Sequence, residues 1–175
     1  MSDIQPGYVG FSRSPGLMGK LIRFGEIISG GKGEVNHMFI FSEREGYRWK
    51  IIQAQMKGVT NTVYFDELAE SSSKVVVVKP PPRVCLPAVV EFAQEQVGIE
   101  YGLGTDIGIG IDMVTWQWVP AVRGARTASW ICSALGCEAL RYGGWLHRWI
   151  DIYTVTPQQA LDELLADGAE IVVTK

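Results

Sequence analysis

Hydrophobic and polar positions divide the chain into short segments with two different spacings. In some segments apolar residues alternate with polar ones, or run without interruption between turn residues, which is typical of strands. In others they recur three and four positions apart, as they do on amphipathic helices. The pattern predicts a turn and a short strand within residues 5–13, and further strands at residues 35–42, 48–56, 61–65, 74–79 and 169–175.

Capping residues place the helices between these strands. Ser14 and Pro15 suit a helix start, Gly30 and Gly31 a helix end, and Thr156 is followed by Pro157 at a further start. The predicted helices are residues 14–31, 66–72, 86–98, 130–142 and 156–168. The glycine-rich residues 98–116 fit either a loop or an irregular helix. Since strands both precede and follow the helices, we expect an α+β fold, in one domain spanning residues 1–175.

The amino-acid composition excludes several classes of protein. The 175 residues are 47% hydrophobic, enough for one full-sized core, and the net charge of −3 without a basic run argues against nucleic-acid binding. The start, MSDIQPGYVG, lacks a signal-peptide pattern, and no apolar stretch is long enough to cross a bilayer, so we expect a cytoplasmic location. Three cysteines without a C-x-x-C pair predict reduced thiols, no metal site and no cofactor. The pattern leaves the oligomeric state open.

Cys132 is the candidate nucleophile. It lies in WICSALGCEAL, residues 130–140, and Ser129 is a plausible N-cap, so the thiol falls in the first helical turn. Unpaired N–H groups and the helix dipole favour a thiolate there. Helical geometry places Cys132 on one face with Gly136 and Ala139, whose small size lets a sheet approach, while Cys137 points about 140° away. The alternative for Cys132 is a buried packing thiol, and we interpret Cys85 as packing.

His37 and Gln53 are the candidate partners of the thiol. His37 begins an apolar strand, and a hairpin pairing Ser42 with Arg48 would set it opposite Gln53, with Gln55 on the same face. A glutamine oxygen can accept the imidazole N–H and fix its tautomer, less effectively than a carboxylate would. The alternatives are a satisfied core histidine and a glutamine at a strand edge. His147 is the other candidate base.

The order of these residues resembles that of the circularly permuted papain-fold hydrolases, the NlpC-like group that includes YiiX-type proteins. The resemblance covers nearly the whole chain. The chain opens with a predicted strand and helix before the strand that carries the histidine, as members of this family do. Four later segments also resemble the family: IIQAQMKGV, VGIEYGLG, WICSALGCEAL and VTPQQALDEL. The resemblance implies a sheet packed against a helix that carries the nucleophile Cys132, with His37 as base, Gln53 as third polar residue and Tyr101 at the family's site tyrosine. Gly7-Tyr8 departs from the family's Gly-Asp, and Gln53 from its frequent glutamate.

The resemblance implies a thiol hydrolase of the amidase or peptidase class, acting through a thioester. Its substrate would be peptide-like, with a lipid acyl ester as the second choice. Five tryptophans lie near Cys132 in sequence and could line a groove, although core packing explains most of them: Trp116, Trp118, Trp130, Trp145 and Trp149. The alternative from another class is a non-catalytic binding or structural module of the same fold, for example in a phage particle.

Overall fold

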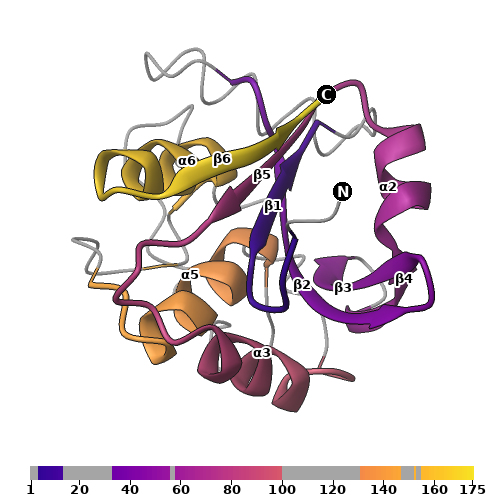
Figure 1. The fold of residues 1–175 in the computed structure, drawn as a ribbon, viewed down its shortest axis with the longest axis horizontal. Coiled ribbons are helices and arrows are strands. Elements are labelled where there is room, and N and C mark those ends of the chain that lie inside the picture. The colour runs from indigo at the N-terminus through magenta and orange to yellow at the C-terminus, as the bar shows by residue number, and fades with distance from the viewer. Residues whose placement is uncertain (1–3, 14–32, 56–57, 100–130, 147–151, 153–154) are drawn as a thin grey trace, which may run out of the picture.

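One antiparallel sheet organises the protein (Figure 1). The structure is a computed structural model that describes residues 4–13, 33–55, 58–99, 131–146, 152 and 155–175. Six strands lie in the order β4-β3-β2-β1-β5-β6, and every neighbouring pair is antiparallel. The strands are β1 (Val9–Ser12), β2 (His37–Glu45), β3 (Arg48–Gln55), β4 (Gly58–Tyr64), β5 (Val75–Lys79) and β6 (Glu170–Thr174).

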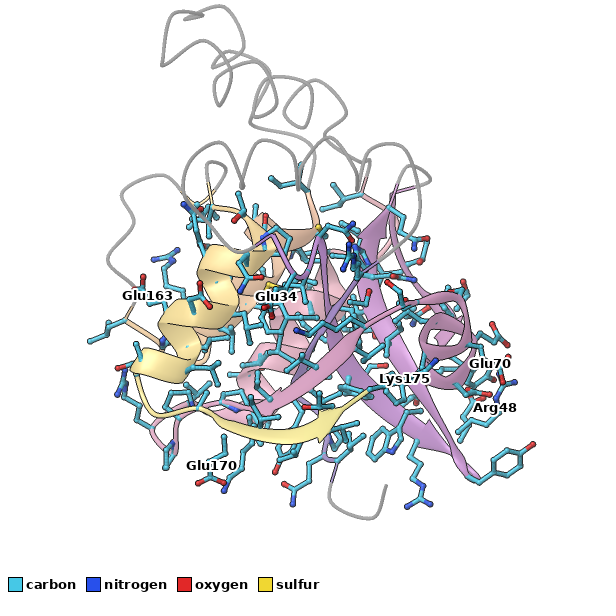
Figure 2. The ribbon with its side chains drawn as sticks, turned by 90° about the horizontal axis from the view of Figure 1, so that it is seen from above. Glu34, Arg48, Glu70, Glu163, Glu170 and Lys175 are labelled. Atoms are coloured by element: carbon cyan, nitrogen blue, oxygen red, sulfur yellow. The ribbon has the colours of Figure 1, made fainter. Side chains whose placement is uncertain are left out.

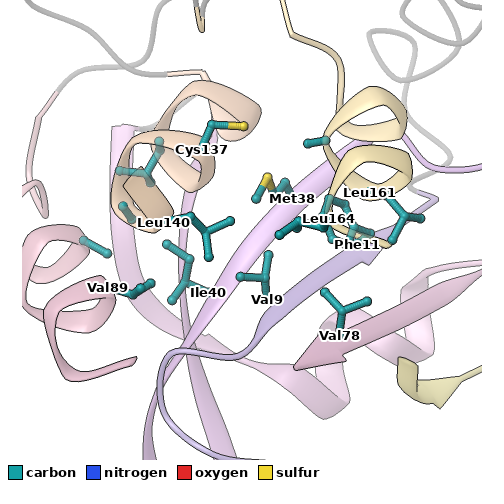
Figure 3. Close-up of a cluster of buried hydrophobic side chains, with 14 of the residues drawn as sticks. Val9, Phe11, Met38, Ile40, Val78, Val89, Cys137, Leu140, Leu161 and Leu164 are labelled. Carbon is teal, nitrogen blue, oxygen red and sulfur yellow. The ribbon is translucent and has the colours of Figure 1, made fainter. Parts of the chain in front are cut away.

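Helices cover both faces of this sheet. They are α2 (Phe65–Ser71), α3 (Leu86–Glu95), α5 (Cys132–Tyr142) and α6 (Pro157–Ala166). Side chains of α3, α5 and α6 share one buried cluster with Met38 and Ile40 of β2, part of which Figure 3 shows. The alternate residues Phe39 and Phe41 belong to a second cluster with α2. The strands are apolar on both sides because both faces are covered, and the predicted α+β class is confirmed.

The direction of α5 along the sheet follows from its glycines. A Cβ built on Gly136 would lie 2.4 Å from Met38 Cε, so the helix touches the start of β2 at this turn, as the small residues predicted. A Cβ on Gly143 would lie 2.6 Å from Val89 and 3.1 Å from Val84, which follow the far end of β5. Since β5 and β2 both flank β1 antiparallel to it, α5 runs along β2 in the same direction. Its first residue, Cys132, therefore lies at the end of the sheet where β2 begins.

The β2–β3 hairpin has a register other than the predicted one. The sequence predicted Ser42 opposite Arg48, whereas the structure pairs Phe41 with Ile51 and has an irregularity between Phe41 and Arg44. The alignment is therefore offset by two residues from the prediction. Because side chains alternate between the faces of a strand, an offset of two returns each side chain to its predicted face.

One smaller expectation is wrong. Cys85, interpreted as a packing residue, is exposed at the position before α3, where the chain leaves a proline-rich turn. The predicted strand at residues 74–79 is β5, an interior strand between β1 and β6. The predicted helix at residues 14–31 and the glycine-rich residues 100–116 lie outside the described residues. Among the described helices, none is both long and apolar enough to cross a membrane.

Candidate functional site

His37 and Gln53 form a buried polar pair on the sheet. His37 Nε2 lies 2.6 Å from Gln53 Oε1, and the two residues are only 8% and 0% exposed. Continuing the observed register of the hairpin sets His37 opposite Gln55, so Gln53 is its diagonal neighbour. Diagonal pairs on one face are within reach of long side chains. The predicted contact is therefore present, although the predicted strand alignment is not.

Gln55 fixes the direction of the Gln53 amide. Gln55 Nε2 donates to Gln53 Oε1 at 3.1 Å, so this oxygen accepts from two sides. An oxygen that accepts from His37 requires a proton on Nε2, because neutral imidazole donates through one nitrogen and accepts through the other. His37 Nδ1 then carries the lone pair. The pair presents a neutral imidazole whose free nitrogen can take a proton, as a general base must.

Burial controls the titration of this histidine. Removal from water lowers the pKa of His37 below its ordinary value of 6.5, and the hydrogen bond that His37 donates to Gln53 offsets part of this shift. Burial acts in this direction because it disfavours the charged form, and a neutral amide compensates less than a carboxylate. His37 is therefore held neutral, ready to accept a proton, over a wider range of pH than an exposed histidine.

This shift predicts a pH-dependent stability. The unfolded chain binds a proton at His37 near pH 6.5, and the folded chain only at lower pH. The unfolding free energy should therefore decrease as the pH falls from 6.5 towards about 5, before most carboxylates titrate. Urea unfolding at a series of pH values measures this slope. His37→Gln should flatten it, and an unchanged slope in His37→Gln would contradict the assignment.

Cys132 occupies the first position of α5. It is 5% exposed, and the residue before it, Ile131, is the N-cap, with an extended backbone and no side-chain cap hydrogen bond. The prediction of Ser129 as the N-cap is therefore wrong, because α5 begins two residues later than a Ser129 cap requires. The thiol is thus in the first turn, as predicted, where N–H groups that have no partner within the helix favour an anion. α5 packs on the face of the sheet that carries Met38, whereas His37 projects from the other face with Phe39, and both Cys132 and His37 lie at the end of the sheet where β2 begins.

Cys137 is a packing cysteine. It is fully buried in the cluster between α5, the sheet and α6 (Figure 3). Burial raises the pKa of the Cys137 thiol far above its usual range, and the nearby Cys132 adds to this shift. A thiol that resists ionisation is a poor nucleophile. This agrees with the expectation that Cys137 points away from Cys132 on the helix, and its side chain lies in the core.

The chain before His37 is anchored by the C-terminal helix. Gln158 Oε1 on α6 accepts hydrogen bonds from the backbone N–H groups of Glu34, at 3.0 Å, and Val35, at 3.2 Å. Gln158 Nε2 donates in turn to Asp162 Oδ1 at 3.0 Å. Figure 2 shows Glu34 beside α6. The direction in which the chain reaches His37 is thus set by a helix more than 120 residues away in sequence.

Two buried polar atoms beside His37 have no hydrogen-bond partner within the described part of the chain: Ser12 Oγ and Gln53 Nε2. Ser12 is 0% exposed and lies directly opposite His37 in the ladder between β1 and β2. Ser12 was not among the residues that the sequence indicated. Its only signal was a polar residue at the end of an apolar strand, and nothing in the sequence sets it opposite the histidine.

The remaining predicted residues fall into two groups. Tyr101 and His147 lie outside the described residues, as do four of the five tryptophans near Cys132. Trp145 is described and is fully buried, with its Nε1 donating to Asp167 at 2.8 Å, as core packing predicts. In the described ranges, no group of three or more histidine, cysteine, aspartate and glutamate side chains could hold a metal ion.

No family model matches the chain, and no curated protein matches it, so its function has to be inferred from the site.

Proposed function

We propose that this protein is a thiol-dependent hydrolase of the amidase or peptidase class, with Cys132 as nucleophile, His37 as base and Gln53 as the residue that orients the base. The observation that carries the proposal is the buried 2.6 Å hydrogen bond between His37 Nε2 and Gln53 Oε1. It leaves His37 Nδ1 as the proton acceptor, at the end of the sheet where α5 begins with Cys132. A helix that starts with a cysteine and packs on an antiparallel sheet also supports a permuted papain-like fold.

The proposed reaction is acyl transfer through a thioester. His37 Nδ1 takes the thiol proton of Cys132, and the sulfur attacks the substrate carbonyl carbon. Backbone N–H groups at the start of α5 stabilise the oxyanion, because they have no partner within the helix. His37 returns the proton to the leaving amine, and water then releases the acid. This mechanism requires the thiol and the imidazole to meet beyond the first residue of β2.

A non-catalytic module of the same fold is the second candidate. It is favoured by the neutral amide at Gln53, which stabilises an imidazolium less than a carboxylate does. A lipid acyl ester in place of a peptide-like amide is an alternative substrate for the same chemistry. The two classes of function differ in the reactivity of the thiol, which an alkylating reagent measures without any knowledge of the substrate.

Alkylation by iodoacetamide across pH tests the proposal. If His37 assists ionisation, Cys132 should react well below pH 8, where an unassisted thiol with a pKa of about 8.5 is mostly protonated. Gln53→Glu should maintain or increase the rate below pH 8, since a carboxylate raises the pKa of His37 and favours the thiolate–imidazolium pair. It also removes only the Nε2 donor, which has no partner among the described residues.

Gln53→Ala is the loss-of-function variant that matches Gln53→Glu. It removes the acceptor of His37 Nε2, so the rate below pH 8 should fall, about tenfold if one orienting hydrogen bond is lost. Tryptic mass mapping assigns the label to Cys132, Cys137 or Cys85, and the exposed Cys85 reports the rate of an ordinary thiol in the same tube. Equal rates for all three forms would show that Gln53 does not orient a base. A Cys132 slower than Cys85 at every pH would favour the non-catalytic module.

A further inference from the structure

A buried hydroxyl without a partner lies next to the proposed base. Ser12 and His37 are direct partners in the antiparallel ladder between β1 and β2, so their side chains project from the same face. The Cβ atoms of such partners lie about 4.5–5.5 Å apart. Ser12 Oγ is nevertheless without a hydrogen bond among the described residues, in a residue that is 0% exposed. Unpaired buried hydroxyls are destabilising and rare, and each one calls for an explanation.

β2 has two neighbouring strands, β1 and β3, and Ser12 lies opposite His37 on β1. Gln53 on β3 occupies Nε2, and the directions of the two ring nitrogens diverge widely. The ring of Phe39 lies along the strand, with its centroid 6.3 Å from that of His37. The same ring extends over Gly10, two residues before Ser12, where a Cβ would lie 2.1 Å from ring atoms. Polar groups thus flank His37 on both neighbouring strands, and an aromatic ring closes the site towards Phe39.

We propose that Ser12 holds the water molecule that hydrolyses the acyl-enzyme. This inference rests on the proposed thiol-hydrolase function. A serine hydroxyl can accept one hydrogen of a water molecule and still donate its own, and a buried water requires two to four polar partners. Ser12 Oγ and His37 Nδ1 supply two of them on one face of the sheet. A water so placed contacts the atom that must take its proton.

The step is balanced by atoms and charges. The water oxygen bonds to the thioester carbonyl carbon, and one water proton passes to His37 Nδ1. The carbon–sulfur bond then breaks, the acid leaves, and the proton on His37 passes to the Cys132 sulfur. Ser12 takes no part in acylation, because no water is consumed until the thioester has formed. Its loss should therefore slow only the second half of the reaction.

Ser12→Ala tests this assignment, with Ser72→Ala as the matched control. Ser72, the residue after α2, carries another buried hydroxyl without a partner in the described residues, and it is not a ladder partner of His37. The purified protein is treated with p-nitrophenyl acetate. Nitrophenol release in the burst reports acylation, and loss of the acetyl group by intact mass reports deacylation. Chemical denaturation or heating measures the stability of each variant.

In Ser12→Ala we expect an unchanged burst rate and deacylation slowed about tenfold or more, since a misplaced reactant commonly costs this much. In Ser72→Ala both rates should match the original protein. Ser72→Ala should be as stable as the original or melt about 2–4 °C higher, because an unsatisfied hydroxyl is removed. Ser12→Ala should melt up to about 4 °C lower, because the proposed water loses one of its hydrogen-bond partners. Equal deacylation in Ser12→Ala would overturn the role of Ser12 alone. An original protein that is never acetylated would overturn the hydrolase proposal and this inference together.

Discussion

Replacing Cys132 by alanine should abolish hydrolysis while leaving the fold intact. Loss of a nucleophile removes the covalent route, so turnover of p-nitrophenyl acetate should fall by about 10³-fold or more. The change shortens one buried side chain at the first position of α5, and the free energy of unfolding should change by no more than about 1–2 kcal/mol. Burst kinetics and urea unfolding on the same preparation measure both quantities.

The other two cysteines are the controls for this result. Cys137→Ala should stay active and lose some stability, since the thiol is fully buried in the core. Cys85→Ala should change neither quantity, because the residue is exposed. If Cys137→Ala is the inactive variant, the nucleophile has been assigned to the wrong side of α5, and His147 becomes the better candidate for the base.

The second large effect is expected at Gly10, on the face of the sheet that carries His37. A Cβ at this position would lie 2.1 Å from ring atoms of Phe39, a distance at which something must move. The ring is 1% exposed, and its centroid lies 5.6 Å from that of Phe41 and 6.1 Å from that of Phe65. Gly10→Ala should therefore cost about 1–3 kcal/mol of unfolding free energy, as overpacking does.

Gly136→Ala is the matched comparison for Gly10→Ala. Its new methyl group would meet the flexible end of Met38, which can turn aside, and alanine favours the helix by about 1 kcal/mol over glycine. Urea unfolding should show a much smaller loss than for Gly10→Ala. A Gly10→Ala protein as stable as the original would mean that the Phe39 ring does not cover the backbone of β1. The ring would then not shape the site around His37.

The faces of the strands were predictable from the sequence, and their alignment was not. Alternation of polar and apolar residues set His37, Gln53 and Gln55 on one face, and the structure agrees. The hairpin register depends on how the turn and the irregularity after Phe41 are built, which residue pattern does not determine. The observed alignment differs from the predicted one by two residues, and an even offset keeps each side chain on its predicted face, so the predicted contact is present. An offset of one residue would have moved Gln53 to the other face.

Contacts between segments that are distant in sequence could not be predicted either. The helix start at Cys132 has a local cause, so the sequence predicted it. Ser12 opposite His37 depends on the pairing of β1 with β2, and the exposure of Cys85 depends on where the proline-rich turn leaves the sheet. Neither has a local signature. The polar group that lies beside the proposed base on β1 could therefore be identified only from the fold.

The bond between Gln158 and the chain before His37 has a consequence for the order in which the protein is assembled. Translation delivers residues 37, 53 and 132 before residue 158, whose side chain anchors the backbone at Glu34 and Val35. On the ribosome, all three proposed site residues therefore exist before the anchor does. The two hydrogen bonds that hold the backbone before His37 can therefore form only after α6 has been synthesised.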